Sequence, residues 1–227
     1  GISAKDLSLD HRTVVARKSR VVKSLVAGVK NSLRKNGVQL VKGAGEITGK
    51  SNEGFRVTVN GDDFIATRLL IATGSTPIVP HIAGMEEGLL EGFVLTSREI
   101  LDLQEIPESL VIIGGGVIGL EMASYFNSAG SKVTVIEMLD HIAGDIDSDI
   151  SRILQDNYGK KGVDFRLNSK VVEIGRGSVI CEANGEKSAV SAEKILLSIG
   201  RRPAVRGVGL GRIGVETVGG RINTDER

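Results

Sequence analysis

The sequence has 227 residues, enough for one large domain or two small ones with a buried core. Its 41% hydrophobic and 25% charged residues are ordinary for a globular protein, and the net charge of +1 argues against nucleic-acid and membrane partners. Cys181 is the only cysteine, so an internal disulfide is excluded and no metal site is expected. With no leader-like segment, we expect a cytoplasmic location.

The first third of the chain predicts one long helix followed by β structure. The helix is expected over residues 11–35, because its apolar residues fall at helical spacing. This apolar stripe consists of Val22, Leu25, Val26, Val29 and Leu33. The strands expected after it are Val38–Val41, a strand around Ile47, Phe55–Val59 and a buried strand at Leu69–Ala72. Asn60 and Gly61 predict a tight turn after Phe55–Val59.

The remainder alternates strands and helices, as in an α/β protein. A short helix is expected near Ser97–Leu103. A strand at Leu110–Ile113 leads through glycines into a helix that ends about Asn127, and Val133–Glu137 is the next strand. A helix over about 147–158 follows. Its expected buried stripe is Ile150, Ile153, Leu154 and Tyr158. The later strands are Val163–Leu167, Val171–Ile174, Val179–Glu182 and Ile195–Ile199.

Two parts of the chain resemble each other. Residues 66–77 (ATRLLIATGSTP) parallel residues 192–203 (AEKILLSIGRRP), and KNGVQL at 35–40 parallels KKGVDF at 160–165. Each copy has the predicted order helix, Gly-Val strand, hairpin, buried strand, Gly, Pro. The shared order favours an internal duplication, in which the first copy is the incomplete one.

A glycine loop follows the strand at Leu110–Ile113. Gly114, Gly116 and Gly119 have the G-x-G-x-x-G spacing, which is weak alone but strong between a strand and a helix. Gly114 permits the turn, Gly116 lets a pyrophosphate approach the backbone, and Gly119 lets helix and strand pack closely. Glu137 ends the next strand near the expected spacing of ~20 residues, where a carboxylate accepts ribose hydroxyls and repels a 2′-phosphate. This pattern predicts a Rossmann-type NAD site; a nucleotide-free fold, with Glu137 a mere surface charge, is the alternative.

These motifs resemble those of the pyridine-nucleotide disulfide oxidoreductases, and especially those of the dihydrolipoamide dehydrogenases in that family. The resemblance covers nearly the whole chain. It is carried by residues 11–47, IATGSTP (71–77), GGGVIGLE (114–121), VTVIE (133–137), SIGRRP (198–203) and the closing stretch 207–226. The fold it implies is α/β, with a Rossmann-like doubly wound parallel sheet and a β-meander, of the glutathione-reductase type, and with an incomplete N-terminal half.

The resemblance also implies a domain order and a set of site residues. Residues 1–87 would be the remainder of an FAD-binding domain, 88–204 the NAD-binding domain, and 205–227 the return segment to the FAD domain. The residues implied for NAD are Gly114, Gly116, Gly119, Glu121, Glu137, Val171 and Gly200. The residues implied for FAD are Thr73, Gly74 and Arg201. The plainer alternatives are an exposed helix acid for Glu121, a core residue for Val171, a surface ion pair for Arg201, and a turn for Thr73-Gly74.

The reaction implied by the resemblance is an NAD-dependent oxidation of protein-bound dihydrolipoamide, in which a dithiol substrate reduces a disulfide and electrons pass through FAD to NAD⁺. The implied roles are redox homeostasis and service to a lipoyl-bearing protein of a 2-oxo acid dehydrogenase or glycine cleavage complex, with the whole enzyme a homodimer. The family's C-x-x-x-x-C pair and its His-Glu base are absent from this sequence. The chain is therefore expected to be catalytically incomplete, with no catalytic residue of its own.

The remaining chemistry-bearing residues suggest no further site. Cys181 is expected to be a buried, inert thiol, and His11, His81 and His141 are expected on surfaces or loops. Alternatives that stay open are another FAD/NADH oxidoreductase of the superfamily, namely an NADH oxidase, soluble transhydrogenase, glutathione reductase or mercuric reductase. A stand-alone NAD-binding module and a purely structural domain also stay open.

Overall fold

The computed structural model describes residue 5 and residues 7–226. The chain divides into two units, one formed by residues 1–21 and 77–200 and the other by residues 22–76 and 201–227. Each unit is described by itself. Within the described residues, no helix has the length and apolar character needed to cross a membrane.

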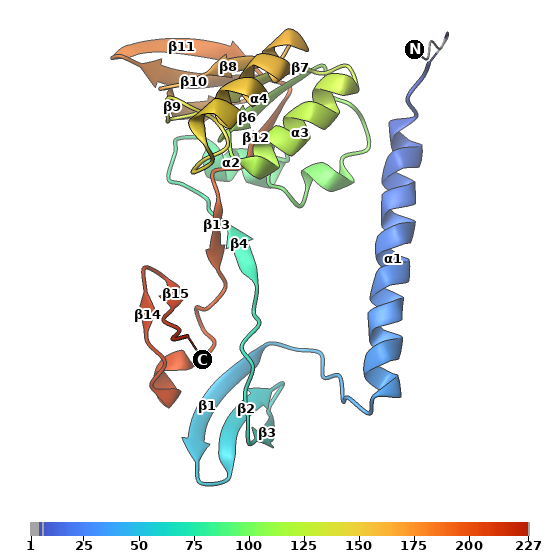
Figure 1. Cartoon of the computed structure of the whole chain (residues 1–227), viewed down its shortest axis with the longest axis vertical. Coiled ribbons are helices and arrows are strands. Elements are labelled where there is room, and N and C mark those ends of the chain that lie inside the picture. The colour runs from blue at the N-terminus through green and yellow to red at the C-terminus, as the bar shows by residue number, and fades with distance from the viewer. Residues whose placement is uncertain (1–4, 6, 227) are drawn as a thin grey trace. The chain divides into compact units, whose positions relative to one another are not determined.

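The first unit is built on a five-stranded parallel sheet (Figure 1). The spatial order of its strands is β5 (Val94–Leu95), β12 (Lys194–Leu197), β6 (Ser109–Ile113), β7 (Lys132–Ile136) and β8 (Asp164–Arg166). All four strand pairs are parallel. The α/β fold expected from the sequence is therefore confirmed, with β6 and β12 side by side at the centre of the sheet.

The residues of β6 alternate between the two faces of the sheet, as the period of a strand requires. Leu110 and Ile112 pack with Phe126 of α3 (Val117–Ser128), and Tyr158 of α4 (Ser148–Lys160) packs against the same cluster. Val111 and Ile113 pack into a cluster on the other face. That cluster includes residues of the antiparallel meander β9 (Lys170–Gly175), β10 (Ser178–Ala183) and β11 (Glu186–Ser191).

Short elements complete this unit. Helix α2 (Met85–Glu91) supplies Met85 to the cluster on the meander side of the sheet. A 3₁₀ turn, η1 (Ile100–Asp102), supplies Ile100 to the cluster on the helix side. This turn is what forms where a short helix was predicted near Ser97–Leu103.

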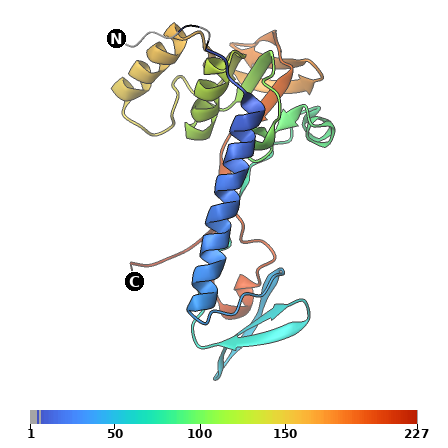
Figure 2. The same ribbon diagram turned by 90° about the vertical axis from the view of Figure 1, so that its right-hand side faces the viewer.

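The second unit contains a second antiparallel meander, β1 (Gly45–Ser51), β2 (Gly54–Val59) and β3 (Asp62–Ala66) (Figure 2). The predicted turn at Asn60-Gly61 joins β2 to β3, and both residues have positive φ, 55° and 94°. A 3₁₀ turn, η2 (Leu210–Ile213), and the hairpin β14 (Thr217–Val218) and β15 (Arg221–Ile222) close the unit. The backbone N–H of Ile47 donates to the carbonyl of Val208 and ties β1 to this closing segment.

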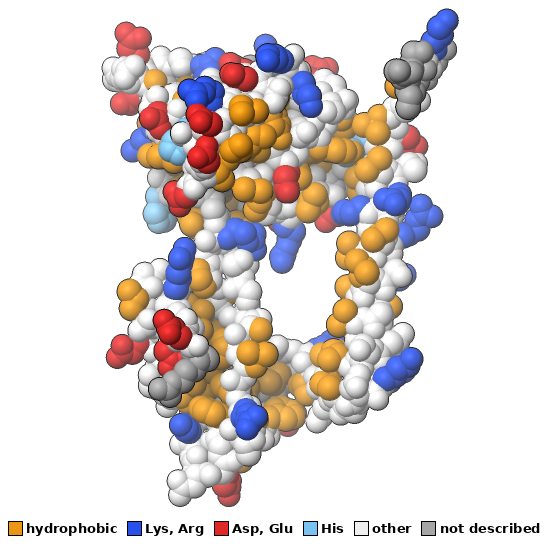
Figure 3. Space-filling view, in the orientation of Figure 1, with side chains coloured by type: hydrophobic (Ala, Val, Ile, Leu, Met, Phe, Trp, Pro, Cys, Tyr) orange, Lys and Arg blue, Asp and Glu red, His pale blue; other side chains and the backbone are white. Residues whose placement is uncertain are grey.

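The predicted long helix is confirmed as α1 (His11–Lys35). Its apolar stripe is largely exposed, however, with Leu25 66% and Val29 61% exposed. Figure 3 shows such side chains along the helix. The stripe was inferred from the spacing of apolar residues alone. This spacing shows which face of the helix is apolar, but it does not show what covers that face.

Two predicted strands are wrong. Leu69–Ala72 and Val38–Val41 are both irregular, and Leu70 is 89% exposed. Leu196, which matches Leu70 in the repeat, is fully buried because β12 pairs with β5 and β6 and Leu196 packs into the cluster between this sheet and α3. No strand of the described residues pairs with 69–72, and an apolar run without neighbouring strands cannot form a buried strand. The stripe of α4 is also partly wrong, because Ile150 and Ile153 are 50% and 54% exposed.

The two copies of the repeat are otherwise alike in the order of their elements. Each has a helix, α1 or α4, followed by a three-stranded meander, β1–β3 or β9–β11. Each also has a short strand at its Gly-x-x-Pro end, β4 (Ser75–Pro77) or β13 (Arg201–Pro203), and these two strands pair. The structure thus supports the duplication that the sequence suggested.

Candidate functional site

A pocket of about 700 Å³ opens at the carboxyl ends of β6, β7 and β12 in the first unit. Strands β7 and β12 flank β6 on opposite sides, so the chain leaves the sheet in different directions at this point. Such a switch point is where open α/β sheets bind ligands. The lining includes five of the residues expected to bind NAD: Gly114, Gly116, Glu137, Val171 and Gly200.

Each glycine of the loop meets a different spatial constraint. Gly114 has φ 102°, and a Cβ there would lie 2.7 Å from the Ser198 carbonyl oxygen. A Cβ at Gly119 would lie 2.3 Å from the Gly114 carbonyl oxygen, so a side chain would drive α3 away from the sheet. A Cβ at Gly116 would meet no atom within 4 Å, so the constraint at Gly116 does not come from the protein itself. Open space above the backbone at this position suits a bound group that approaches closely.

Helix α3 begins directly after Gly116, which is its N-cap residue. The first N–H groups of a helix have no partner within the helix, and the helix dipole adds a partial positive charge at the same end. Gly116, Val117 and Ile118 line the pocket. This end of the pocket therefore has the chemistry of a phosphate-binding site.

Glu137 follows β7 and supplies the carboxylate at another side of the pocket. Its Oε2 accepts a hydrogen bond from the Gly115 N–H over 2.7 Å, and its Oε1 accepts one from the Leu139 N–H over 3.0 Å. The side chain is half-buried. A negative charge thus stands next to the glycine loop, where it can accept hydroxyl donors and repel anions.

Ser198 is a pocket residue that the sequence reasoning missed. It follows β12, and its hydroxyl lies 3.1 Å from the carbonyl oxygen of Ile113 and 3.0 Å from that of Gly114. A donor shared between these carbonyls ties the end of β12 to the glycine loop. The sequence signal was its place directly after a predicted strand, beside Gly200, in a segment that the repeat had already marked.

The wall of the pocket is mostly apolar. Ile82, Val117, Ile118 and Ile199 contribute to it, and Val171 is both a wall residue and a buried member of the core, with 4% exposure. The two interpretations of Val171, as a core residue and as a wall of the site, are therefore compatible. His81 also lines the pocket, from an exposed loop position.

Five expected site residues lie outside this lining, and one of them, Gly119, is buried in α3 below the glycine loop. Glu121 is exposed on α3, one helical turn after Val117. Thr73, Gly74 and Arg201 belong to the second unit and are exposed. Arg201 donates from Nε to the Ser75 hydroxyl over 2.8 Å and from a terminal nitrogen to the Ser75 carbonyl over 2.7 Å.

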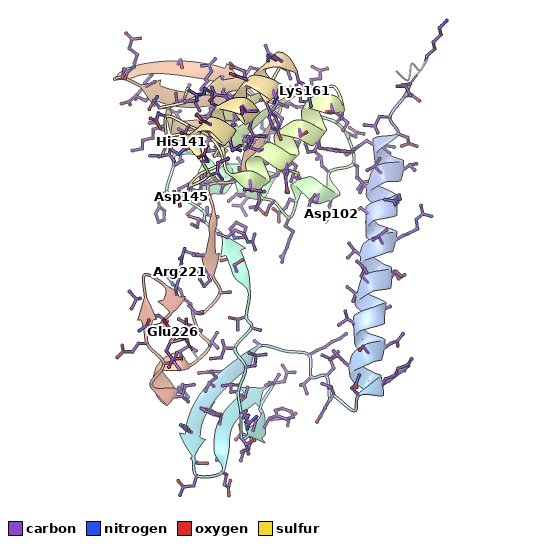
Figure 4. The ribbon with its side chains drawn as sticks, viewed as in Figure 1. Asp102, His141, Asp145, Lys161, Arg221 and Glu226 are labelled. Atoms are coloured by element: carbon purple, nitrogen blue, oxygen red, sulfur yellow. The ribbon has the colours of Figure 1, made fainter. Side chains whose placement is uncertain are left out.

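The remaining cysteine and histidine side chains lie outside the pocket lining, apart from His81. Cys181 is buried in β10, and its sulfur lies 3.3 Å from the Ser188 hydroxyl. His141 lies on the loop between β7 and α4, as expected (Figure 4). The surface assignment of His11 is wrong, because this residue is 8% exposed and hydrogen-bonded at both ring nitrogens. Among the residues described, no three His, Cys, Asp or Glu side chains cluster as metal ligands.

Comparison with known proteins gives the family. The family pattern described as "Pyridine nucleotide-disulphide oxidoreductase" matches residues 3–227. The chain belongs to the pyridine nucleotide-disulphide oxidoreductases. Two dihydrolipoyl dehydrogenases are similar to it along its whole length, that of Acholeplasma laidlawii with 38% identity and that of Bacillus subtilis with 36%.

A solved structure of this family agrees with the fold. The HOCl-induced flavoprotein disulfide reductase RclA of Escherichia coli aligns with a TM-score of 0.81 and 28% identity over 93% of this chain and 48% of its own. The chain spans 66% of the Acholeplasma laidlawii relative and 50% of the Bacillus subtilis relative. This pyridine nucleotide-disulphide oxidoreductase chain thus corresponds to about half to two thirds of these three proteins.

Proposed function

We propose that this chain supplies the NAD(H) site of a flavin-dependent dihydrolipoamide dehydrogenase. The observation that carries the proposal is the pocket at the ends of β6, β7 and β12, where an open glycine backbone and a helix N-terminus stand beside the Glu137 carboxylate. Gly114 and Gly116 would approach the pyrophosphate, and Gly119 would bind it only indirectly, by letting α3 pack close to β6. Glu137 would hold the adenosine ribose, and Val171 and Gly200 would form the remaining walls. Glu121, one turn along α3, would face the nicotinamide end. When bound, the nicotinamide supplies hydride acceptance.

The domain assignment and the remaining cofactor belong to the same proposal. Residues 88–204 would form the NAD-binding domain, residues 1–87 part of an FAD-binding domain, and 205–227 the segment returning to it. Thr73, Gly74 and Arg201 would contact FAD. The dithiol chemistry would reside outside this chain, because Cys181 is its only cysteine and is buried. The partner would be a lipoyl-bearing protein of a 2-oxo acid dehydrogenase or glycine cleavage complex, met in the cytoplasm by a homodimer of the whole enzyme.

A second candidate function is that of another flavoprotein disulfide reductase of the same superfamily. The likeness to RclA, whose name describes a flavoprotein disulfide reductase, supports it. Both candidates require a dinucleotide in the pocket. They differ in the disulfide substrate, so assays of the substrate distinguish them and assays of nucleotide binding do not.

The test is a calorimetric titration of this chain with NADH and with NADPH, beside a Glu137→Arg variant. The proposal expects the wild type to bind NADH more tightly and the variant to lose or reverse this preference, because the guanidinium attracts the 2′-phosphate that the carboxylate repels. A folded wild type that binds neither nucleotide would overturn it. For the catalytic part, we expect no dihydrolipoamide-dependent NADH formation by the chain alone; measurable turnover would contradict the assignment of the redox cysteines to another part of the enzyme.

A further inference from the structure

The loop between β7 and α4 forms one wall of the pocket through Leu139 and Gly144. Two backbone hydrogen bonds hold it. The Leu139 N–H donates to Oε1 of Glu137 at 3.0 Å, and the Ala143 N–H donates to the carbonyl oxygen of Gly115 at 2.8 Å. Ala143 has φ 67°, a conformation that a non-glycine residue keeps only where its surroundings hold it. The shape of this wall therefore depends on contacts within the loop.

The ring of His141 supplies such contacts. Its Nδ1 lies 2.6 Å from a carboxylate oxygen of Asp140, and its Nε2 lies 3.2 Å from the carbonyl oxygen of Gly144. An ionised carboxylate and a backbone carbonyl only accept hydrogen bonds, so each ring nitrogen must carry a proton. Only the imidazolium form has both N–H groups. In the neutral ring one nitrogen turns a lone pair toward an acceptor, and one of the two contacts is lost.

The charges around the ring favour the imidazolium form. The hydrogen bond to Asp140 raises the pKa of His141 most, and the Gly144 carbonyl and the Glu137 carboxylate raise it further, against an opposing effect of partial burial. Asp147, at the start of α4, accepts from two N–H groups of its own helix as the N-cap. The His141 side chain is 41% exposed, so its proton can exchange with solvent.

Loss of one of these contacts changes the wall of the pocket. In the imidazolium form the ring joins Asp140 to Gly144 and so closes the loop around Ala143. In the neutral form Gly144 or Asp140 is released, and the wall gains conformational freedom. A bound nucleotide would have to remove that freedom, and ordering a loosened segment weakens binding. The positive charge of the imidazolium also attracts the pyrophosphate, which is an effect of the same sign.

We propose that His141 is a positioning residue of the dinucleotide pocket: its imidazolium form holds the loop between β7 and α4 in the shape that binds the nucleotide, so that binding is coupled to the uptake of a proton. The proposal rests on the proposed function, since it concerns the same pocket. By this coupling the nucleotide and the proton strengthen each other's binding.

The test measures the dissociation constant of NADH with the whole chain from about pH 6 to about pH 9, the range in which histidine titrates. NADPH is not used, because its 2′-phosphate has a pKa of about 6 and titrates as well. We expect the constant to rise about twofold to fivefold as pH increases, the effect of one exposed charge-assisted contact. Calorimetry in two buffers of different ionisation enthalpy should show that a fraction of a proton is taken up on binding.

Two substitutions of His141 should give the two limits of this titration. Arginine is charged throughout the range and can donate to both acceptors, so His141→Arg should bind NADH independently of pH, with about the affinity of the wild type at low pH. Glutamine has no charge, so His141→Gln should bind independently of pH with about the affinity of the wild type at high pH. His81, which also lines the pocket, is the competing source of the proton. Whatever its affinity, His81→Gln should keep the pH dependence.

The acid partner gives a second comparison. Asp140→Asn should move the midpoint of the pH dependence to lower pH, because the amide stabilises the imidazolium less than the carboxylate does. Asp145→Asn, which removes another acid of the loop, is the matched control and should keep the midpoint. An NADH dissociation constant that does not vary with pH, or that varies equally in His141→Gln, overturns the proposal and leaves the NAD assignment intact. So does a pH dependence lost in His81→Gln. A folded wild type that binds no NADH at any pH overturns both.

Discussion

Ser75 and Arg201, which occupy equivalent positions in the two copies of the repeat, are hydrogen-bonded to each other through the Ser75 hydroxyl and the Arg201 Nε, 2.8 Å apart. The backbone around them is reciprocal. The Ala204 N–H donates to the Gly74 carbonyl at 2.9 Å, and the Ile78 N–H donates to the Gly200 carbonyl at 3.0 Å. Since β4 and β13 pair in this way, equivalent segments of a duplicated sequence serve as each other's partners.

The first prediction concerns the two equivalent glycines whose carbonyl groups accept these hydrogen bonds. Gly74 and Gly200 have φ of 74° and 120°, and a Cβ on either would meet nothing closer than 3.5 Å. Substitution by alanine therefore costs backbone strain and no steric clash. We expect each of Gly74→Ala and Gly200→Ala to lower the free energy of unfolding by about 1–2 kcal/mol, measured by denaturant titration.

Nucleotide binding should distinguish these two variants. Gly200 lines the pocket, whereas Gly74 belongs to the other unit. Only Gly200→Ala should then weaken the binding of NADH, and Gly74→Ala is its matched control. Equal weakening by both would show that the effect passes through stability and not through the pocket.

The second prediction concerns the buried His11. Its Nε2 faces the Leu103 carbonyl at 2.9 Å and must donate, so in the neutral ring Nδ1 accepts from the Tyr125 hydroxyl at 2.8 Å. We expect His11→Ala to destabilise the first unit by about 2–3 kcal/mol, because two hydrogen bonds and a buried ring are lost. Tyr125→Phe, which removes only the bond to Nδ1, should cost about 1 kcal/mol. Hydrogen exchange in the first turns of α1 measures both; wild-type protection in His11→Ala would contradict the anchoring role.

The third prediction is a pH dependence of the loop between β7 and α4. A hydrogen bond to Asp140 raises the pKa of His141 above its ordinary 6.5, and the same bond lowers the pKa of Asp140 below its ordinary 3.8. The contribution of His141 to stability is complete below pH 6.5 and is lost as pH rises through the raised pKa. That of Asp140 is complete above pH 3.8 and is lost as pH falls through the lowered pKa. The loop should thus be best ordered between these two values.

Proton NMR titration of the His141 ring checks this assignment. In Asp140→Asn the pKa of His141 should fall, because the amide cannot stabilise the imidazolium as a carboxylate does. Asp145→Asn is the matched control, since it removes a carboxylate of the same loop (Figure 4) that is not hydrogen-bonded to the ring. A fall of the same size in both variants would show a general charge effect and contradict the specific contact.

The sequence predicted those parts of the fold whose signals are local. The glycine loop and the strands β6 and β7 follow from motifs within one short stretch of sequence. Asn60 and Gly61 specify the turn between β2 and β3, because both residue types tolerate positive φ. Leu69–Ala72 failed because an apolar run does not reveal whether neighbouring strands exist, and the segment lacks the partners that bury β12. That Gly114, Gly116 and Glu137 lie around one pocket was predictable for the same local reason.

What the sequence could not show were contacts between distant segments. The partners of His11 lie 92 and 114 residues away, and a histidine at the start of a helix carries no local sign of burial. Gly115 stands at an unspecified position of the G-x-G-x-x-G pattern, so its contact with Glu137 required coordinates. Ser198 likewise gained its role only when β12 was found beside β6.

The last prediction tests the packing of the glycine loop against α3. In Gly119→Ala the new Cβ would lie 2.3 Å from the Gly114 carbonyl oxygen, 2.8 Å from the Ser198 hydroxyl and 3.1 Å from Cγ2 of Ile112. A backbone carbonyl at this distance cannot move without displacing the loop. We therefore expect a loss of about 3 kcal/mol in the free energy of unfolding, at the upper end of the cost of overpacking, together with weakened NADH binding.

Gly159 provides the matched control, because it lies in α4 and its Cβ would meet nothing within 4 Å. Gly159→Ala should raise the free energy of unfolding by about 0.5–1 kcal/mol, since alanine is the better helix former and restricts the unfolded chain. Denaturant titrations of the two variants measure opposite signs for the same chemical change. A Gly119→Ala variant as stable as the wild type would mean that α3 can move away from β6, and the close contact of helix and strand at the pocket would not be needed for the fold.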